Sequence, residues 1–212
     1  MAELNNKIAA LEEEIEAGKG EENPPQFDSN MYPNGVNANF YNIEKLPAEQ
    51  VLGKFAGIFE DKESRDIARV APDLIKMLES FGLVEGARVV DVGCGTGLLL
   101  SKLSKAVGAT GSVVATEICQ VFHDHLVKKE EAEGLNNSMC LFNDNPRNPQ
   151  IEQFRGAVDL ILIIDVYHHL EYPRTFMRHL KDALKPTGLF ADIPLYYAIC
   201  VALLILLDVV LM

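Results

Sequence analysis

Cysteines are few in this sequence, and no two of them stand close together. The four lie at positions 94, 119, 140 and 200 and form no Cys-x-x-Cys pair. This spacing argues against zinc and disulfides and favours reduced thiols, so we expect a cytoplasmic protein without a metal site. Residues 1–6 lack the basic flank and apolar run of a secretory signal and the arginines of a transit peptide.

Basic residues are also in the minority. Lys and Arg number 19 against 31 Asp and Glu, which gives a net charge of −12. The acidic residues are scattered rather than gathered in one block, so we expect no nucleic-acid partner. With 212 residues, of which 48% are hydrophobic, the chain is long enough for one globular domain with appendages.

Composition divides the chain into four parts. Residues 1–17 repeat apolar side chains at spacings of four and three, which predicts a short helix. About two heptads are too few for a firm coiled coil, so a solvated helix is favoured over a weak dimer contact. Residues 18–46 are rich in Gly, Pro and Asn and are interpreted as a linker, 47–193 as the domain, and 194–212 as a hydrophobic tail.

Within the domain, strand and helix patterns alternate. Helices are predicted at 48–59, 65–81, 98–107, 119–135 and 173–184, and strands at 89–92, 112–117, 138–142, 158–165 and 189–193. Repeated strand–helix–strand units imply a parallel sheet with right-handed crossovers. The run from Val158 to Ile164 is apolar except for Asp159, as a central strand buried on both faces requires.

A glycine-rich turn follows the first predicted strand. Its sequence, from Asp91 through Gly93, Cys94 and Gly95 to Gly97, lets the backbone adopt positive φ and lets a ligand approach closely. The free N–H groups of the following helix then favour an anionic group. Glycine comes one place too early for a dinucleotide fingerprint, and no Gly-Lys-Ser/Thr follows as a P-loop would need.

This Asp-x-Gly-x-Gly-x-Gly pattern resembles motif I of the class I S-adenosylmethionine-dependent methyltransferases, and the resemblance extends over 83–193. It implies an α/β fold: a Rossmann-like three-layer sandwich with a mostly parallel sheet. It also implies that the cofactor is S-adenosylmethionine, with its methionyl carboxylate near the turn. The cofactor-binding residues carried over from the motif are Asp91, Gly93, Cys94, Gly95 and Gly97.

Three further acidic residues fall where the resemblance places cofactor contacts. Glu117 ends the second strand, where the family has an acid that binds the ribose hydroxyls. Asp144 is the candidate for the adenine amine, with Asn143 and Asn145 as close rivals. Asp165 ends the fourth strand and so reaches the same edge of the sheet as the glycine turn.

The residues after the fourth strand are the candidates for chemistry. Tyr167, His168 and His169 resemble the motif at which the substrate meets the methyl group in small-molecule methyltransferases. Histidine can accept a proton near neutral pH, although paired histidines also commonly cap and pack the next helix. His123 and His125 lie two apart on a predicted helix and point in different directions, so they cannot share a metal ion.

The resemblance ends at residue 193. A complete domain of this family continues with a further helix and two strands, so we expect the last strands to be missing. Residues 195–212 carry one charge, Asp208. Three interpretations stay open: a membrane anchor, an apolar segment that covers the edge of the fifth strand, and an aberrant end on a truncated product.

These observations predict a methyltransferase that moves a methyl group from S-adenosylmethionine to a small-molecule acceptor. The alternative is a truncated protein that binds cofactor or partners with weak or no catalysis, anchored to a membrane by its tail. A nicotinamide-dependent dehydrogenase conflicts with the glycine spacing.

Overall fold

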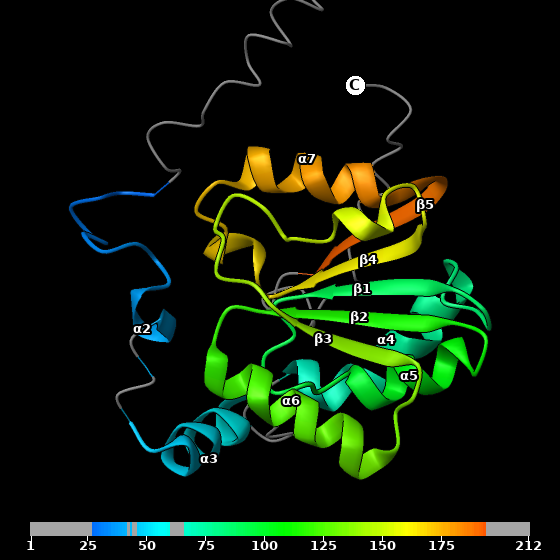
Figure 1. Ribbon diagram of the computed structural model, residues 1–212, viewed down its shortest axis with the longest axis horizontal. Coiled ribbons are helices and arrows are strands. Elements are labelled where there is room, and N and C mark those ends of the chain that lie inside the picture. The colour runs from blue at the N-terminus through cyan, green and yellow to red at the C-terminus, as the bar shows by residue number, and fades with distance from the viewer. Residues whose placement is uncertain (1–26, 42, 44–45, 60–65, 194–212) are drawn as a thin grey trace, which may run out of the picture.

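The computed structural model of the chain describes residues 27–41, 43, 46–59 and 66–193 (Figure 1). The helix predicted over 1–17 and the tail at 194–212 lie outside these residues, and so does the region in which strands were expected to be missing. In the part of the chain that is described, no helix combines the length and the hydropathy needed to cross a bilayer.

A five-stranded sheet forms the centre of the domain. Its spatial order is β3-β2-β1-β4-β5, and every neighbouring pair is parallel. The strands are β1 (Arg88–Val92), β2 (Ser112–Glu117), β3 (Ser138–Phe142), β4 (Val158–Ile164) and β5 (Leu184–Ile193). The predicted parallel α/β fold is confirmed, and the bounds of β2 and β3 agree with the sequence pattern to the residue.

Helices cover both faces of this sheet and make the predicted three-layer sandwich (Figure 1). On one face lie α4, α5 and α6, and on the other lies α7. Their bounds are Asp66–Ser80 for α4, Leu100–Val107 for α5, Gln120–Glu133 for α6 and Pro173–Ala183 for α7. The short 3-10 helices η2 (Glu152–Phe154) and η3 (Tyr167–His169) lie before and after β4.

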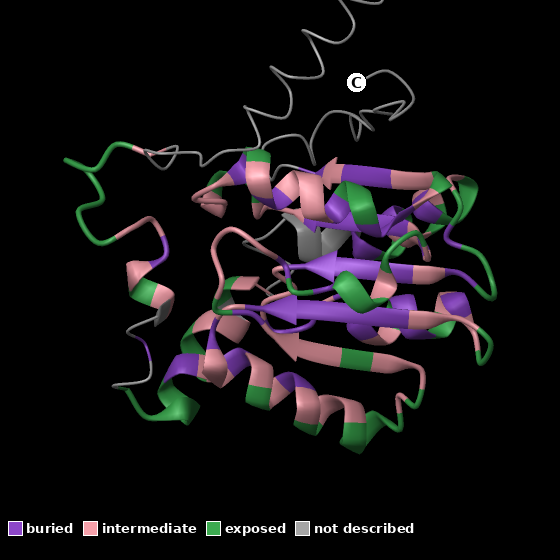
Figure 2. Ribbon diagram, turned by 45° about the horizontal axis from the view of Figure 1, so that its top comes forward, coloured by how far each residue is buried: buried purple, intermediate pink, exposed green. Residues whose placement is uncertain are grey.

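The two layers of core follow from the alternation of side chains along each strand. Val89 and Leu160 pack with the helices of the first face, whereas Val90 and Ile161 pack with Phe176 of α7. The central strands are therefore buried on both sides, while edge strand β3 is half exposed (Figure 2). The continuous apolar run of β4 has this cause, because side chains on either face meet a helix layer.

Strand β5 begins earlier than the sequence predicts. Residues 185–188 include Pro186 and Gly188, residue types that are typical of turns, yet they belong to the strand. Pro186 is tolerated because β5 is an edge strand, and the N–H groups on its outer edge need no partner strand. Gly188 allows close pairing, since a Cβ there would lie 2.8 Å from the Val158 carbonyl oxygen. The strand prediction 189–193 was therefore too short.

Part of the segment interpreted as linker packs on the domain. Helix α2 (Ala38–Tyr41) and helix α3 (Ala48–Phe59) lie toward the carboxyl ends of the strands (Figure 1). Phe40 of α2 and Phe55 of α3 pack against Phe122 of α6, with ring centroids 6.5 and 5.3 Å from that ring. The cluster of Phe40, Phe55 and Phe122 gives the sheet edge an apolar cover. Tyr32, which precedes α2, is 42% exposed.

Candidate functional site

One cavity of about 220 Å³ opens at the carboxyl ends of the parallel strands. This is the edge at which α/β folds bind ligands, because the loops after several strands meet there. Four loops and the N-terminal segment wall it. The lining residues used below are Asn37, Phe40, Phe59, Asp91, Gly93, Cys94, Gly95, Glu117, Asn143, Asn145, Pro146, Asp165, Val166, His169, Leu170, Glu171 and Phe176.

The glycine turn after β1 uses its three glycines for different purposes. All three adopt positive φ: Gly93 at 66°, Gly95 at 58° and Gly97 at 77°. A Cβ on Gly93 would lie 2.8 Å from the methyl groups of Val166, so this glycine allows the β4 loop to approach. A Cβ on Gly97 would lie 2.5 Å from Leu126 of α6. Gly97 therefore serves packing, and it does not line the cavity.

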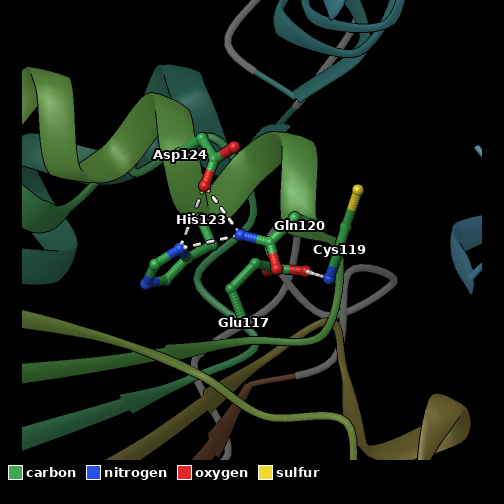
Figure 3. A network of polar contacts seen from close by, with 5 residues as sticks. All are labelled: Glu117, Cys119, Gln120, His123 and Asp124. Atoms are coloured by element: carbon green, nitrogen blue, oxygen red, sulfur yellow. Dashed lines mark hydrogen bonds and ion pairs between the residues drawn. The ribbon is translucent and has the colours of Figure 1, made fainter. Parts of the chain in front are cut away.

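Glu117 holds the glycine turn in place. Its Oε2 accepts a hydrogen bond of 2.8 Å from the Gly95 N–H, 22 residues away. Its Oε1 accepts from the N–H groups of Ile118 and Cys119, at 2.9 Å each. Figure 3 shows this carboxylate beside the Cys119 nitrogen, at the start of α6. Because three backbone donors converge on it, Glu117 fixes the end of β2 and the tip of the turn together.

Neighbouring groups on α6 form a separate polar network at the same helix start. The Gln120 side chain donates to Asp124 at 2.7 Å and lies 3.4 Å from His123 Nδ1 (Figure 3). None of these three side chains lines the cavity. Among the described residues, no group of three or more His, Cys, Asp or Glu side chains is arranged to hold a metal ion.

Two of the carboxyl groups that line the cavity beside the glycine turn are buried. Asp91 is 4% exposed and Glu117 is 5% exposed. Burial raises the pKa of Asp91 to about 7. Burial also raises the pKa of Glu117 to about 7, opposed by its three backbone donors and reinforced by Asp91. No Lys or Arg is among the described lining residues, so a cationic ligand would stabilise both ionised carboxylates.

The loop after β3 presents amides rather than the predicted carboxylate. Asn143 is buried; its N–H donates to the Glu117 carbonyl oxygen at 2.8 Å, and its side chain accepts from the Asn145 N–H at 2.9 Å. Asn143, Asn145 and Pro146 line the cavity. Asp144 lies between them but is exposed and does not line it.

The loop after β4 begins with an unusual backbone conformation. Asp165 adopts φ of 56°, which is uncommon for a residue other than glycine. Its N–H donates to the Ile193 carbonyl oxygen at 2.9 Å, which ties the loop to the end of β5. Asp165 and His169 line the cavity, whereas the predicted neighbours Tyr167 and His168 are exposed and do not.

His169 is the histidine that faces the cavity. Burial lowers its pKa, and the neighbouring His168 lowers it further, against a smaller opposing effect of Asp165. The side-chain N–H of Asn37 donates to the His169 carbonyl oxygen at 2.8 Å. The ring of Phe40 packs edge-on to the imidazole, with centroids 5.6 Å apart. The imidazole is thus held neutral near pH 7 and can accept a proton.

Four lining residues that matter below were not among the predicted site residues. Asn37 and Phe40 lie in the segment interpreted as linker, Phe59 ends α3, and Glu171 follows η3. A segment rich in Gly, Pro and Asn carries no periodicity that would show which side chains turn inward. The one available signal was the presence of isolated aromatic residues in that polar segment.

Comparison with known proteins gives a consistent relationship. A family model described as a methyltransferase domain matches residues 62–192. A ubiquinone biosynthesis O-methyltransferase from Hydrogenovibrio crunogenus is 25% identical over 130 residues, which cover 61% of this chain and 51% of that protein. The mitochondrial ubiquinone biosynthesis O-methyltransferase of Saccharomyces cerevisiae is 28% identical over 101 residues, 46% of this chain and 30% of that protein. The chain spans about half the length of the first of these relatives.

Solved structures agree with this relationship. A SAM-dependent methyltransferase from Aquifex aeolicus is 28% identical, with a TM-score of 0.53 over 69% of this chain and 72% of that one. Coclaurine N-methyltransferase bound to N-methylheliamine and SAH is 16% identical, with a TM-score of 0.50 over 59% and 35%, and shows the shared fold alone. Because the family model covers more than half of the chain and the fold agrees, this chain belongs to the class I methyltransferase family.

Proposed function

We propose that this chain binds S-adenosylmethionine in the cavity and transfers its methyl group to an oxygen of a small-molecule acceptor. The observation that supports this most is the glycine turn pinned by Glu117 at the carboxyl edge of the sheet. Both the curated relatives named above are O-methyltransferases, which supports an oxygen acceptor.

The residues present fit this cofactor. Its cationic end would be stabilised by the two buried carboxyl groups, Asp91 and Glu117, for which the described lining offers no other cation. An ionised carboxylate has about four acceptor sites. Glu117 uses three of them on backbone donors, which leaves Oε2 able to accept from one ribose hydroxyl. The open turn at Gly93, Cys94 and Gly95 is proposed to receive the methionyl group.

The adenine contact is proposed at the loop after β3. The predicted contact, Asp144, would have to rotate from solvent to reach the cavity, whereas Asn143 and Asn145 already line it. We therefore propose that an amide of this loop, rather than Asp144, recognises the base. Asp165 lines the cavity just after β4, where the acceptor side begins, and is proposed as a further cofactor contact at that boundary.

The main contribution of the protein to methyl transfer is to position the two reactants. When bound, the cofactor supplies a methyl group on a positively charged sulfur, which is a good leaving group. The chain's own residues hold the acceptor oxygen in line and exclude water. His169 is proposed to accept the proton of the acceptor hydroxyl, because it is the neutral base that faces the cavity. Tyr167 and His168 are left outside this assignment by their exposure.

Calorimetric titration with S-adenosylmethionine tests this proposal. The intact chain is expected to bind with a micromolar dissociation constant. Gly95→Arg should weaken binding by at least ~100-fold, because a side chain at this φ is strained and points beside Phe59 into the cavity. The matched control is Gly53→Arg on α3, where nothing lies within 4 Å of the added Cβ. No heat of binding from well-folded protein would contradict the proposal.

A further inference from the structure

The acceptor side of the cavity holds polar atoms that have no partner. Among the described residues, the buried side-chain atoms without a hydrogen bond include Asn37 Oδ1, His169 Nδ1 and Glu171 Oε1. All three residues line the cavity, and Asn37 is only 5% exposed. A buried acceptor without a donor is unfavourable, so these atoms point to a donor, from water or from a ligand, that completes them.

Two of these three atoms can only accept hydrogen bonds. Asn37 donates its Nδ2 to the His169 carbonyl oxygen, so the unpartnered atom of this amide is the oxygen, which only accepts. The carboxylate of Glu171 also only accepts, and the ring nitrogen of a neutral His169 can accept as well. A ligand that satisfies these atoms must bring N–H or O–H donors.

The N-terminal segment holds these atoms together. Gly35 lies against the Glu171 carboxylate so closely that a Cβ there would be 2.5 Å from Oε1. Asn37 hydrogen-bonds to the His169 backbone, and Phe40 packs on the His169 ring. Residues 35–40 therefore run along residues 169–171 and complete the wall of the cavity on this side.

The charge of the lining excludes one class of acceptor. The described lining includes the carboxylates Asp165 and Glu171 on this side and contains no Lys or Arg. Nearby cations are engaged elsewhere: Lys129 donates to the Gly97 carbonyl oxygen at 3.0 Å, and Arg147 lies 3.6 Å from the centroid of the Tyr172 ring. An anionic acceptor would lose its hydration here and meet like charge.

The remaining lining of this side is apolar and partly aromatic. It consists of Phe40, Val166, Leu170 and Phe176. Such a wall suits a flat apolar body, with the few polar atoms fixing its orientation.

We propose that Asn37 and Glu171, with His169, form an acceptor subsite selective for uncharged or cationic small molecules that carry a hydroxyl or amine donor on an apolar ring. This rests on the proposed function for the identity of the reaction, and it adds the class of substrate and two specificity-determining residues. Asn37 and Glu171 orient the acceptor, and neither takes part in the transfer itself.

Three probes of matched shape test the selectivity: 2-phenylethanol, 2-phenylethylamine and phenylacetate. Their binding is measured by saturation-transfer NMR and calorimetry on the intact chain, with and without S-adenosylhomocysteine. The alcohol and the amine should bind, and phenylacetate should bind at least ~10-fold more weakly, because like charges placed together are strongly disfavoured.

Two substitutions assign that selectivity to the subsite. Glu171→Gln removes a negative charge while keeping the size of the side chain. It should reduce the ratio of the dissociation constants of phenylacetate and 2-phenylethylamine by about threefold or more. Glu133→Gln, on an exposed face of α6, is the control and should leave this ratio unchanged. Gly35→Ala displaces the Glu171 carboxylate without changing any charge, so it should weaken binding of 2-phenylethylamine. Gly53→Ala should leave that binding unchanged. Far-UV circular dichroism verifies that each variant is folded.

The outcomes separate this inference from the proposed function. Binding of S-adenosylhomocysteine together with equal or preferred binding of phenylacetate, or with no binding of any probe, would overturn the subsite. If Glu171→Gln left the affinity ratio of 2-phenylethylamine to phenylacetate unchanged, the proposed role of Glu171 would be wrong. Absence of S-adenosylhomocysteine binding, with the probe order still as expected, would overturn the proposed methyl transfer and leave the subsite standing.

Discussion

The two halves of the cavity differ in how their polar groups are satisfied. The half proposed to hold the cofactor is formed by 91–97, Glu117 and 143–146 and is called the cofactor half. In it, backbone N–H groups and carboxylate oxygens pair with each other across strand ends. In the acceptor half, formed by 35–40 and 165–171, three side-chain atoms are left without partners. The first half is thus held by the sheet itself, whereas the second is a surface that a ligand completes.

The same contrast extends to charge. The buried carboxyl groups of the cofactor half have raised pKa values, whereas His169 of the acceptor half has a lowered pKa. Burial is the main cause in each case, and it favours the neutral form of both kinds of group. A positively charged ligand would therefore draw protons off the buried carboxyl groups of the cofactor half.

The sharpest way to separate the halves is a pair of variants with opposite kinetic effects. His169→Gln should lower kcat by about 10²–10⁴-fold, because general-base catalysis contributes this much. Glu117→Ala should instead weaken S-adenosylmethionine binding by about 100-fold, because hydrogen bonds to a charged group are worth roughly 1.5–3 kcal/mol. Steady-state kinetics and calorimetry measure the two effects.

The control for this pair is Glu133→Ala, an exposed carboxylate on α6 away from the cavity. It should change neither kcat nor cofactor affinity. If His169→Gln weakened cofactor binding as strongly as Glu117→Ala does, the division into two halves would be wrong.

The second test concerns how rigidly the cofactor half is packed. Gly97→Ala should destabilise the fold by about 2–4 kcal/mol, because it combines a left-handed φ with overpacking against Leu126. Gly134 also has a left-handed φ, of 65°, but nothing lies within 4 Å of an added Cβ. Gly134→Ala should therefore lose only about 1 kcal/mol. Urea denaturation compares the two, and equal losses would show that the contact with Leu126 relaxes freely.

The third test uses pH, because the halves should respond with opposite sign. Asp91 and Glu117 keep their protons in the folded protein up to about pH 7, whereas the unfolded chain loses them near pH 4. Their contribution therefore makes the free protein less stable as pH rises from about 4 to about 7. His169 acts oppositely: the stability it contributes is present above about pH 6.5 and is lost as pH falls through its lowered pKa.

Urea midpoints between pH 4.5 and 8 measure this difference. Asp91→Asn should flatten the decline by about 1 kcal/mol or more, since one pKa unit corresponds to about 1.4 kcal/mol. His169→Gln should flatten the opposing rise at the acidic end. A midpoint profile of Asp91→Asn that parallels the unsubstituted protein would show that Asp91 ionises at its ordinary pKa.

Local sequence signals predicted the cofactor half better than the acceptor half. The strands that carry Asp91 and Glu117 are short valine-rich runs, and strand propensity and burial agree there. Position alone placed Glu117 at the sheet edge, but its bond to Gly95 depends on which strands are neighbours. That arrangement is a tertiary property.

Elsewhere tertiary contacts overrode the local signal. Pro186 and Gly188 indicate a turn, yet pairing with β4 extends β5 across them. The contact between Asn37 and His169 joins residues 132 apart in the chain, and no spacing rule reaches that far. The inward orientation of Asn143 and Asn145 rather than Asp144 was also beyond sequence reasoning, because all three share turn propensity.

The strip of chain at 35–40 lies before the family-matched residues 62–192. It touches the acceptor half through Gly35, Asn37 and Phe40, while the cofactor half draws its hydrogen bonds from the strands. Residues 35–40 can therefore be varied by protein engineering separately from the residues of the cofactor half. A library randomised at these three positions would search for new acceptors while leaving the cofactor machinery untouched, so selection for a new product would start from enzymes already able to hold their methyl donor.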